Sequence, residues 1–286
     1  LNRSHVNKTP KTRNVHPPVL IRPDLNPKLV WRLLLVLSHF MVGFLLAFVT
    51  GLFFFRPAAW HRPMMSWWLR RLTGILNLDI VVHGKPVDEP ALWISNHVSW
   101  MDIPVLGGIR PLSFLSKAEV ARWPLIGRLA RAAGTLFIQR GSGDSDQVKN
   151  QIVAALGEGR RVLFFPEGTT TAGHSIKRFF AKLFAAAVES ECLIQPMLIC
   201  YRDAQGGLNP LAPFIGEDEL TAHLLHMLAS DRIAVEVKFL PAQRAGGRNV
   251  RDLGHHFEEV MRRALHELHG VEQPPSRDGL PGVRAA

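Results

Sequence analysis

Two residues that lie five positions apart, His97 and Asp102, could together move a proton. The imidazole of histidine titrates near neutral pH, so His97 can act as a general base. A carboxylate about one helical turn further on can reach back to one ring nitrogen and stabilise the imidazolium, as in the His–Asp half of a catalytic triad. A hydroxyl of the substrate can then be the nucleophile. The alternative is that Asn96 caps a helix and Asp102 is solvated.

A second cluster consists of Glu167, Gly168 and Thr169, directly after the apolar run 162–165. Glycine permits close approach to the backbone, and exposed amides at such a turn can hold an oxyanion or a phosphate. A glutamate beside them repels phosphate unless it binds a hydroxyl or positions a neighbouring cation. The alternative is an ordinary turn that ends a strand.

Two cations also follow apolar runs. Lys117 comes directly after 113–116, and Arg140 comes directly after 135–139. The guanidinium of arginine grips phosphate through a bidentate fork, and lysine offers a point charge. Taken singly, such cations are usually solvated.

The elements that must position these residues alternate along the chain. Strands are expected at 80–83, 92–95, 113–116, 135–139, 162–165, 194–199 and 234–239. Helices are expected at 102–107, 124–133, 144–156, 175–189, 218–229 and 249–269. This alternation predicts an α/β fold with a mostly parallel sheet flanked by helices. The carboxyl ends of parallel strands meet at one edge of a sheet, which would bring the two clusters and the two cations together.

Residues 33–55 contain no Asp, Glu, Lys or Arg. At ~1.5 Å per residue this stretch is ~35 Å long, enough to cross a hydrocarbon core of ~30 Å. A buried core helix and a cleaved signal peptide are the weaker alternatives, because soluble helices rarely run so long without charge and no small-residue cleavage site follows. The stretch therefore predicts a membrane helix.

The next segment, 58–76, is amphipathic. Large apolar residues including Trp60 and Trp68 recur at helical spacing, and Arg62 and Arg70 lie on the opposite face. Tryptophan beside arginine suits the headgroup boundary of a bilayer, although an ordinary helix packed on the domain is the alternative. Pro63 favours a start near His61, because proline fits the first turn of a helix.

Charge shows where a membrane partner would bind. Residues 1–71 hold eleven Lys and Arg and one acidic residue, whereas the other 215 residues hold 23 of each sign. This excess lies beside the apolar segment, so it indicates membrane lipid and argues against nucleic acid as the partner. Cys192 and Cys200 lie in an apolar stretch without metal-ligand spacing, and no metal is expected.

The composition predicts four segments: a basic mobile arm at 1–27, membrane-anchoring and interfacial helices at 28–76, a catalytic domain at 77–270 and a flexible tail at 271–286. Positive residues flank the apolar stretch on both sides, so the positive-inside rule gives no orientation. Two topologies stay open. A helix pair could enter one leaflet and return, or one helix could span the bilayer with the bulk of the protein in the cytosol.

The motifs around His97, Lys117, Arg140 and Glu167, taken in chain order, resemble sequence blocks of the lysophosphatidic acid acyltransferase family. Members of this family are glycerolipid acyltransferases that make phosphatidic acid. Residues 96–102 resemble the N-H-x-S-W-x-D block, and residues 165–169, Phe-Pro-Glu-Gly-Thr, resemble the third block. Residues 117–140 look like the second block and 194–197 like the fourth. The resemblance covers about residues 77–240.

The resemblance implies a mechanism. His97 would deprotonate the hydroxyl of a lysolipid, which attacks the thioester of acyl-CoA or acyl carrier protein, and Asp102 would orient His97. The amide of Gly168 would help to stabilise the tetrahedral oxyanion. The acyl donor is a co-substrate, and neither a cofactor nor a metal is implied.

The resemblance also implies an acceptor pocket. Glu167 and Thr169 would shape it, and Lys117 and Arg140 would meet the phosphate of the lysolipid. It further implies a location at the inner membrane, with the catalytic domain facing the cytosol.

One position departs from the family. Thr170 stands where the third block often has an arginine that binds phosphate, and Lys177 or Arg178 would have to supply that charge. The expected acceptor is 1-acyl-glycerol-3-phosphate. The alternatives are another lysolipid such as lyso-ornithine lipid, or a protein that binds anionic lipid without turnover.

Overall fold

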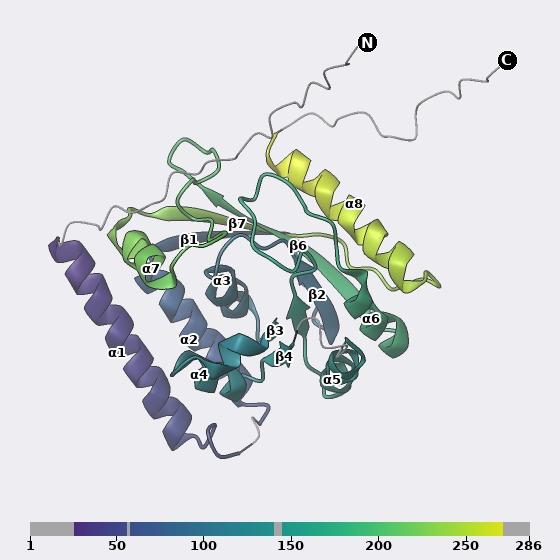
Figure 1. The fold of residues 1–286 in the computed structure, drawn as a ribbon, viewed down its shortest axis with the longest axis horizontal. Helices are drawn as coiled ribbons and strands as arrows, with labels where there is room; N and C mark the ends of the chain where they lie inside the picture. Colours follow the sequence, from purple (N-terminus) through teal and green to yellow (C-terminus); the bar gives the residue numbers. More distant parts are fainter. Residues whose placement is uncertain (1–25, 56–57, 140–144, 271–286) are drawn as a thin grey trace, which may run out of the picture.

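The structure is a computed structural model that describes residues 26–55, 58–139 and 145–270. Within these ranges, seven strands form one sheet with the order β1-β7-β6-β2-β5-β3-β4 (Figure 1). Neighbouring strands are parallel except β6 and β7, which confirms the mostly parallel α/β fold. The strands are β1 Leu78–His83, β2 Ala91–Ser95, β3 Ser113–Lys117, β4 Leu136–Ile138, β5 Val162–Phe164, β6 Leu193–Arg202 and β7 Ile233–Phe239.

Helices cover both faces of the sheet (Figure 1). One face carries α1 Pro27–Val49, α2 His61–Ile75, α3 Asp102–Ile109 and α7 Leu220–Ala229. The other carries α5 Ser145–Gly157, α6 Ala185–Ser190 and α8 Val250–Leu268, while α4 Ile126–Ala132 and the short 3-10 turns Ala118–Arg122 and Ala181–Phe184 lie in connections.

The central strand β2 shows how the sequence selects this layering. Trp93 packs into the hydrophobic cluster on the α3 side, and Leu92 and Ile94 pack into the cluster on the α8 side. All five residues of β2 are buried. A strand covered on both faces reads as a continuous apolar run, as this one does.

All seven expected strands are present, with ends displaced by at most three residues. The helix expected at 175–189 is wrong in its first part, because residues 175–180 form no helix before the 3-10 turn and α6. The amide of Lys177 donates to Glu167 at 2.9 Å, and the amide of Phe179 donates to Glu258 at 2.9 Å. These amides have distant partners, so they are unavailable for helical bonds.

The amphipathic helix α2 begins at His61 as expected, but its polar face is partly buried against α3. The Ser66 hydroxyl donates to the Gly107 carbonyl at 2.7 Å, and the Arg70 guanidinium donates to the Gly108 carbonyl at 3.0 Å. The two glycines of α3 let the helices approach closely, since an added Cβ at Gly108 would lie 3.1 Å from the Arg70 backbone. Trp67 is exposed instead.

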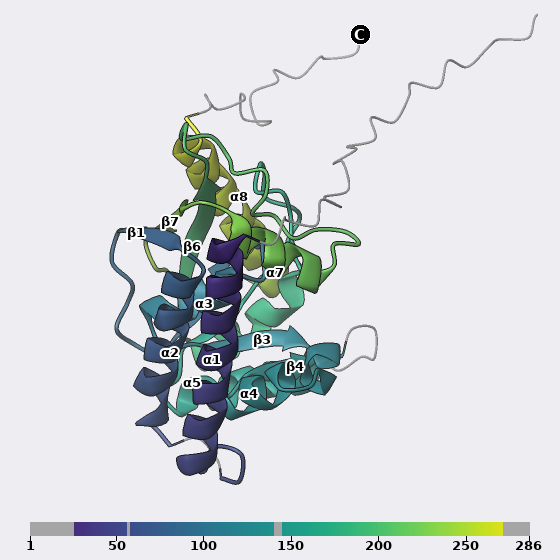
Figure 2. The ribbon, with the colours of Figure 1, turned by 90° about the vertical axis from the view of Figure 1, so that its left-hand side faces the viewer.

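The first helix, α1, lies lengthwise along one side of the domain, next to α2 (Figure 2). Asn26 caps it by accepting from the Leu29 amide at 2.8 Å, and Pro27 begins it. Among the described residues, α1 is the one helix that is long and apolar enough to cross a membrane.

The predicted arm at 1–27, except its last two residues, and the predicted tail at 271–286 lie outside the described residues. The four-segment division therefore stays a prediction.

Candidate active site

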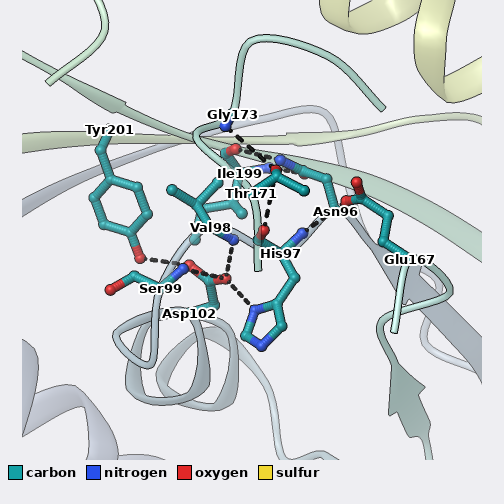
Figure 3. Close-up of polar contacts among 10 residues, drawn as sticks. All are labelled: Asn96, His97, Val98, Ser99, Asp102, Glu167, Thr171, Gly173, Ile199 and Tyr201. Atoms are coloured by element: carbon teal, nitrogen blue, oxygen red, sulfur yellow. Dashed lines mark hydrogen bonds and ion pairs between the residues drawn. The ribbon is translucent and has the colours of Figure 1, made fainter. Parts of the chain in front are cut away.

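The His97–Asp102 pair lies where β2 ends and α3 begins. His97 Nδ1 is 2.7 Å from Asp102 Oδ2 (Figure 3). Asp102 is the first residue of α3 and is completely buried, whereas the His97 side chain is 20% exposed. With Nδ1–H donated to the carboxylate, Nε2 is the ring nitrogen that can accept a proton. His97 lines a cavity, so the pair has the geometry of a general base held by a carboxylate.

The Asp102 carboxylate accepts hydrogen bonds at both oxygens. Oδ2 accepts from His97 Nδ1, from the Val98 amide at 2.8 Å and from the Ser99 amide at 3.1 Å. Oδ1 accepts from the hydroxyl of Tyr201 at 2.7 Å. A buried carboxylate remains ionised only when such donors surround it. These bonds fix the plane of the carboxylate and thereby the ring of His97.

The loop that carries His97 is anchored on both sides. The Asn96 amide group donates to the Ile199 carbonyl at 2.9 Å and accepts from the Ile199 amide at 2.8 Å, which ties the loop to β6. The His97 carbonyl accepts from the Thr171 amide at 2.8 Å. Asn96 is thus a bridge between strands, and the helix cap considered from sequence is not formed.

The ring of Phe165 stacks on His97. Their centroids are 3.8 Å apart and their planes differ by 9°. Phe165 follows β5, which is paired with β2. The imidazole is therefore held at one edge by Asp102 and on one face by an aromatic ring, and this limits its rotation.

Glu167 joins the loop that carries His97 to the segment that carries Lys177. Its side chain is buried and accepts from the His97 amide at 3.1 Å and from the Lys177 amide at 2.9 Å. Burial raises the pKa of this carboxyl above its ordinary value, while the two amides oppose the rise. Glu167 is absent from the residues that line the cavity, so any effect on the acceptor pocket is indirect.

The turn after Glu167 does line the cavity, through Gly168, Thr169 and Thr170. Gly168 has a φ of +68°, a conformation that favours glycine. Its amide donates to the Phe165 carbonyl at 3.0 Å. Because the turn already uses this amide, the oxyanion role of Gly168 stays a prediction that requires the bond to be shared or released.

The cavity has a volume of about 1890 Å³. Its walls include His97, Lys117 at the end of β3, and Arg178 in the segment before α6. Apolar side chains of α1 and α2 line another part of it, among them Val36, Phe40, Leu46, Met64, Trp68 and Leu72. The strand order thus brings together the expected residues at the ends of β2, β3 and β5. Arg140 lies outside the described residues.

Two residues at the site carried no motif signal. The first is Tyr201 on β6, the single tyrosine of the chain, whose hydroxyl inside an apolar strand needs a partner. The second is His223 on α7, which accepts from the indole Nε1 of Trp100 at 3.0 Å and whose own Nε2 lies 3.2 Å from the Pro213 carbonyl. Burial lowers the pKa of His223, which favours the neutral ring that this arrangement requires.

Within the described ranges, no cluster of His, Cys, Asp or Glu has the arrangement of a metal site. Cys200 is buried and Cys192 is half-buried, and both are free.

The comparisons with known proteins agree on one chemistry. The profile of the family described as Acyltransferase matches residues 79–200. A lyso-ornithine lipid O-acyltransferase of Pseudomonas aeruginosa is 45% identical over 205 residues, which cover 72% of this chain and 79% of the relative. A 1-acyl-sn-glycerol-3-phosphate acyltransferase of Neisseria gonorrhoeae is 31% identical over 168 residues, which cover 57% of this chain and 66% of the relative.

The fold also has a solved counterpart. The crystal structure of the LPA acyltransferase of Thermotoga maritima matches with a TM-score of 0.60 and 21% sequence identity. The match covers 86% of this chain and 100% of the counterpart. At this identity, the likeness establishes the fold.

Proposed function

Because the chain belongs to the acyltransferase family and is an O-acyltransferase, we propose that it moves a fatty acyl group from a thioester to the free hydroxyl of lyso-ornithine lipid. The observation that carries acyl transfer is the His97–Asp102 pair, 2.7 Å apart, on the wall of a largely apolar cavity. A lipid hydroxyl can approach Nε2 there while its tail contacts apolar walls.

In the proposed reaction, His97 Nε2 takes the proton of the acceptor hydroxyl as the oxygen attacks the thioester carbonyl. The Asp102 carboxylate stabilises the imidazolium that forms. Collapse of the tetrahedral intermediate breaks the C–S bond, and the departing thiolate takes the proton from Nε2. The products are an ester and a free thiol, and His97 is neutral again. The donor is acyl-CoA or acyl carrier protein, bound as a substrate.

Two observations favour lyso-ornithine lipid over 1-acyl-glycerol-3-phosphate, the acceptor expected first. Four relatives are named lyso-ornithine lipid O-acyltransferase, including the one at 45% identity. The cavity wall also carries both signs, and Thr170 stands where the family often has a phosphate-binding arginine. The charged lining residues are Lys117, Arg178, Lys182 and Arg251 with Glu119, Asp252 and Glu258. A zwitterionic headgroup with one carboxylate and one ammonium suits such a wall better than a phosphate dianion.

We expect lyso-ornithine lipid to be acylated with a kcat/KM at least about tenfold above that for 1-acyl-glycerol-3-phosphate, because a site for a zwitterion leaves the second phosphate charge unpaired. Purified protein in detergent with one acyl-CoA and a panel of lysolipids would be followed by thiol release.

Thr170→Arg is the matched variant for this panel. This variant should reduce the difference in kcat/KM between the two acceptors, because the new arginine should raise the kcat/KM for 1-acyl-glycerol-3-phosphate. A wild-type preference for the phosphate acceptor would overturn the assignment of headgroup, and thiol release with neither acceptor would overturn acyl transfer to these lipids.

The packing of α1 bears on how the protein meets the membrane. The Arg32 guanidinium donates to the Leu228 carbonyl at 3.1 Å and to the Ser230 carbonyl at 2.7 Å. The Lys28 ammonium lies 2.7 Å from Asp231. One face of α1 is buried against α7, α2 and α4. The opposite face exposes large apolar side chains, namely Val30, Trp31, Leu34, Leu37, Met41, Val42, Leu45, Phe48 and Val49.

A helix that packs along its length against a folded domain cannot cross a bilayer without bringing that domain into the hydrocarbon core. We therefore propose that the exposed face of α1 enters one leaflet in the plane of the membrane, with the domain on the cytosolic side of the inner membrane. Trp60 and Trp67 are also exposed, and tryptophan suits the headgroup region.

Spin labels would test this arrangement. Labels at Leu34→Cys, Met41→Cys and Phe48→Cys, in a Cys192→Ser background, should report similar shallow depths from oxygen and nickel-chelate accessibility. A deepest label at Met41→Cys, with the two flanking labels near opposite interfaces, would show a membrane-spanning helix instead.

A further inference from the structure

Tyr201 contacts the catalytic pair but has no role in the reaction proposed above. It is fully buried on β6, the strand beside β2, and its hydroxyl is 2.7 Å from Asp102 Oδ1. Figure 3 shows it on the side of the carboxylate opposite His97. A buried phenol that donates to a buried carboxylate makes a charge-assisted hydrogen bond, which is among the strong ones.

The division of donors between the two carboxylate oxygens gives this bond a particular effect. Oδ2 is shared by His97 and two backbone amides, whereas Tyr201 is the donor recorded on Oδ1 within the described residues. Without it, Oδ1 would be a buried acceptor without a partner, and the carboxylate would gain freedom to rotate about its Cβ–Cγ bond.

We propose that Tyr201 is a positioning residue for the reaction: its hydroxyl holds Asp102 Oδ1, so that Oδ2 stays in the plane of the His97 ring. The same hydrogen bond partly neutralises the negative charge of the carboxylate. This inference rests on the proposed acyl transfer, in which His97 is the base. Burial, and then the neighbouring Asp102, raise the pKa of the Tyr201 phenol well above its usual range. The phenol therefore remains a donor across the working pH range.

Other titratable groups surround this network and must be considered in any pH profile. Glu167 interacts electrostatically with His97, and Cys200 interacts with Tyr201 from the same strand. Lys117 and Arg178 share the cavity wall with His97. A substitution at Tyr201 leaves all of these groups in place. A changed pH profile of activity would therefore report on the hydrogen bonds among Tyr201, Asp102 and His97.

Tyr201→Phe keeps the ring and removes the hydroxyl. We expect kcat to fall by about tenfold with KM nearly unchanged, because the lost bond misorients the base and not the lipid. Loss of the donor also leaves more negative charge facing the imidazolium, so we expect the acid limb of the kcat/KM profile to move to higher pH.

Two controls separate positioning from damage to the fold. Ser66→Ala removes another buried hydroxyl, which donates to the Gly107 carbonyl at 2.7 Å, and should change stability without moving the pH profile. In an Asp102→Asn background, Tyr201→Phe should cost about twofold or less, because the charge that the hydroxyl moderates is gone. An equal cost in both backgrounds, or an unmoved acid limb, would overturn the proposal.

A readout without turnover keeps this inference separate from the proposed function. In protein labelled with ¹⁵N-histidine, the Nδ1–H proton of His97 can be assigned by its loss in His97→Ala. It should change its chemical shift in Tyr201→Phe and stay in place in Ser66→Ala. An unchanged signal in Tyr201→Phe would overturn the positioning role, whereas absent thiol release by the unsubstituted chain would count against acyl transfer.

Discussion

Replacing His97 by alanine is expected to lower kcat for acyl transfer by about 10²- to 10⁴-fold, the usual worth of a general base. Without the imidazole, the acceptor hydroxyl has to lose its proton to water, and the departing thiolate has no nearby acid. The loss should fall on kcat much more than on KM, because the ring acts in the transition state. Thiol release from acyl-CoA in detergent, with lyso-ornithine lipid as acceptor, measures it.

The matched control is His256→Ala. His256 lies on α8, where its Nε2 is 2.8 Å from Gln243 Oε1, and it is absent from the cavity wall. It should keep nearly full activity. If His97→Ala turned over as fast as this control, His97 would not be the base and the proposed mechanism would fail.

The second large effect is expected from Asp102→Asn, with a loss in kcat of up to about 10⁴-fold, comparable with or smaller than that of His97→Ala. The structure indicates that this variant can fold. An amide oxygen can occupy the Oδ2 position and accept from His97 and the two backbone amides, and the amide NH₂ can donate to the Tyr201 hydroxyl. What disappears is the negative charge that stabilises the imidazolium.

Asp102→Ala supplies the contrast. It leaves two buried backbone amides and a buried phenol without partners, so it should lower the melting temperature strongly, whereas Asp102→Asn should change it little. Full activity in a well-folded Asp102→Asn protein would contradict the electrostatic role and leave Asp102 a structural residue.

The sequence predicted the arrangement of the sheet edge because each motif follows a strand. His97 and Gly168 come after β2 and β5, and Lys117 is the last residue of β3. These three strands are adjacent and parallel. Convergence then follows from topology. Local patterns of this kind are visible in one sequence, since each needs only a strand and the residues directly after it.

The contacts that the sequence did not reveal join segments far apart in the chain. Glu167 binds the amides of His97 and Lys177, and Tyr201 binds Asp102 from a strand 99 positions away. The family resemblance implied that Glu167 shapes the acceptor pocket, but its carboxylate accepts from these two amides and does not line the cavity. The periodicity of apolar residues predicts which face of an element is buried. It does not predict which distant donor will form a hydrogen bond with a buried oxygen.

The faces of α2 were misread for a related reason. Serine and arginine on one face indicate solvent when a helix is considered alone. Here that face meets the bare carbonyls of Gly107 and Gly108, which accept from Ser66 and Arg70, and it is Trp67 that is exposed. The two glycines of α3, Gly107 and Gly108, create this surface, and the sequence of α2 gives no sign of it.

The walls of the cavity have a consequence for kinetics. Residues of α1 and α2 line the same space as His97. If α1 lies in one leaflet as proposed, we expect the lipid to reach this space from the leaflet without its tail entering water. Withdrawal of a long chain into water costs about 0.8 kcal/mol per methylene, and this route avoids that cost. The concentration that governs turnover is then two-dimensional: diluting the acceptor with inert lipid should slow the enzyme, whereas diluting the whole vesicle suspension should not.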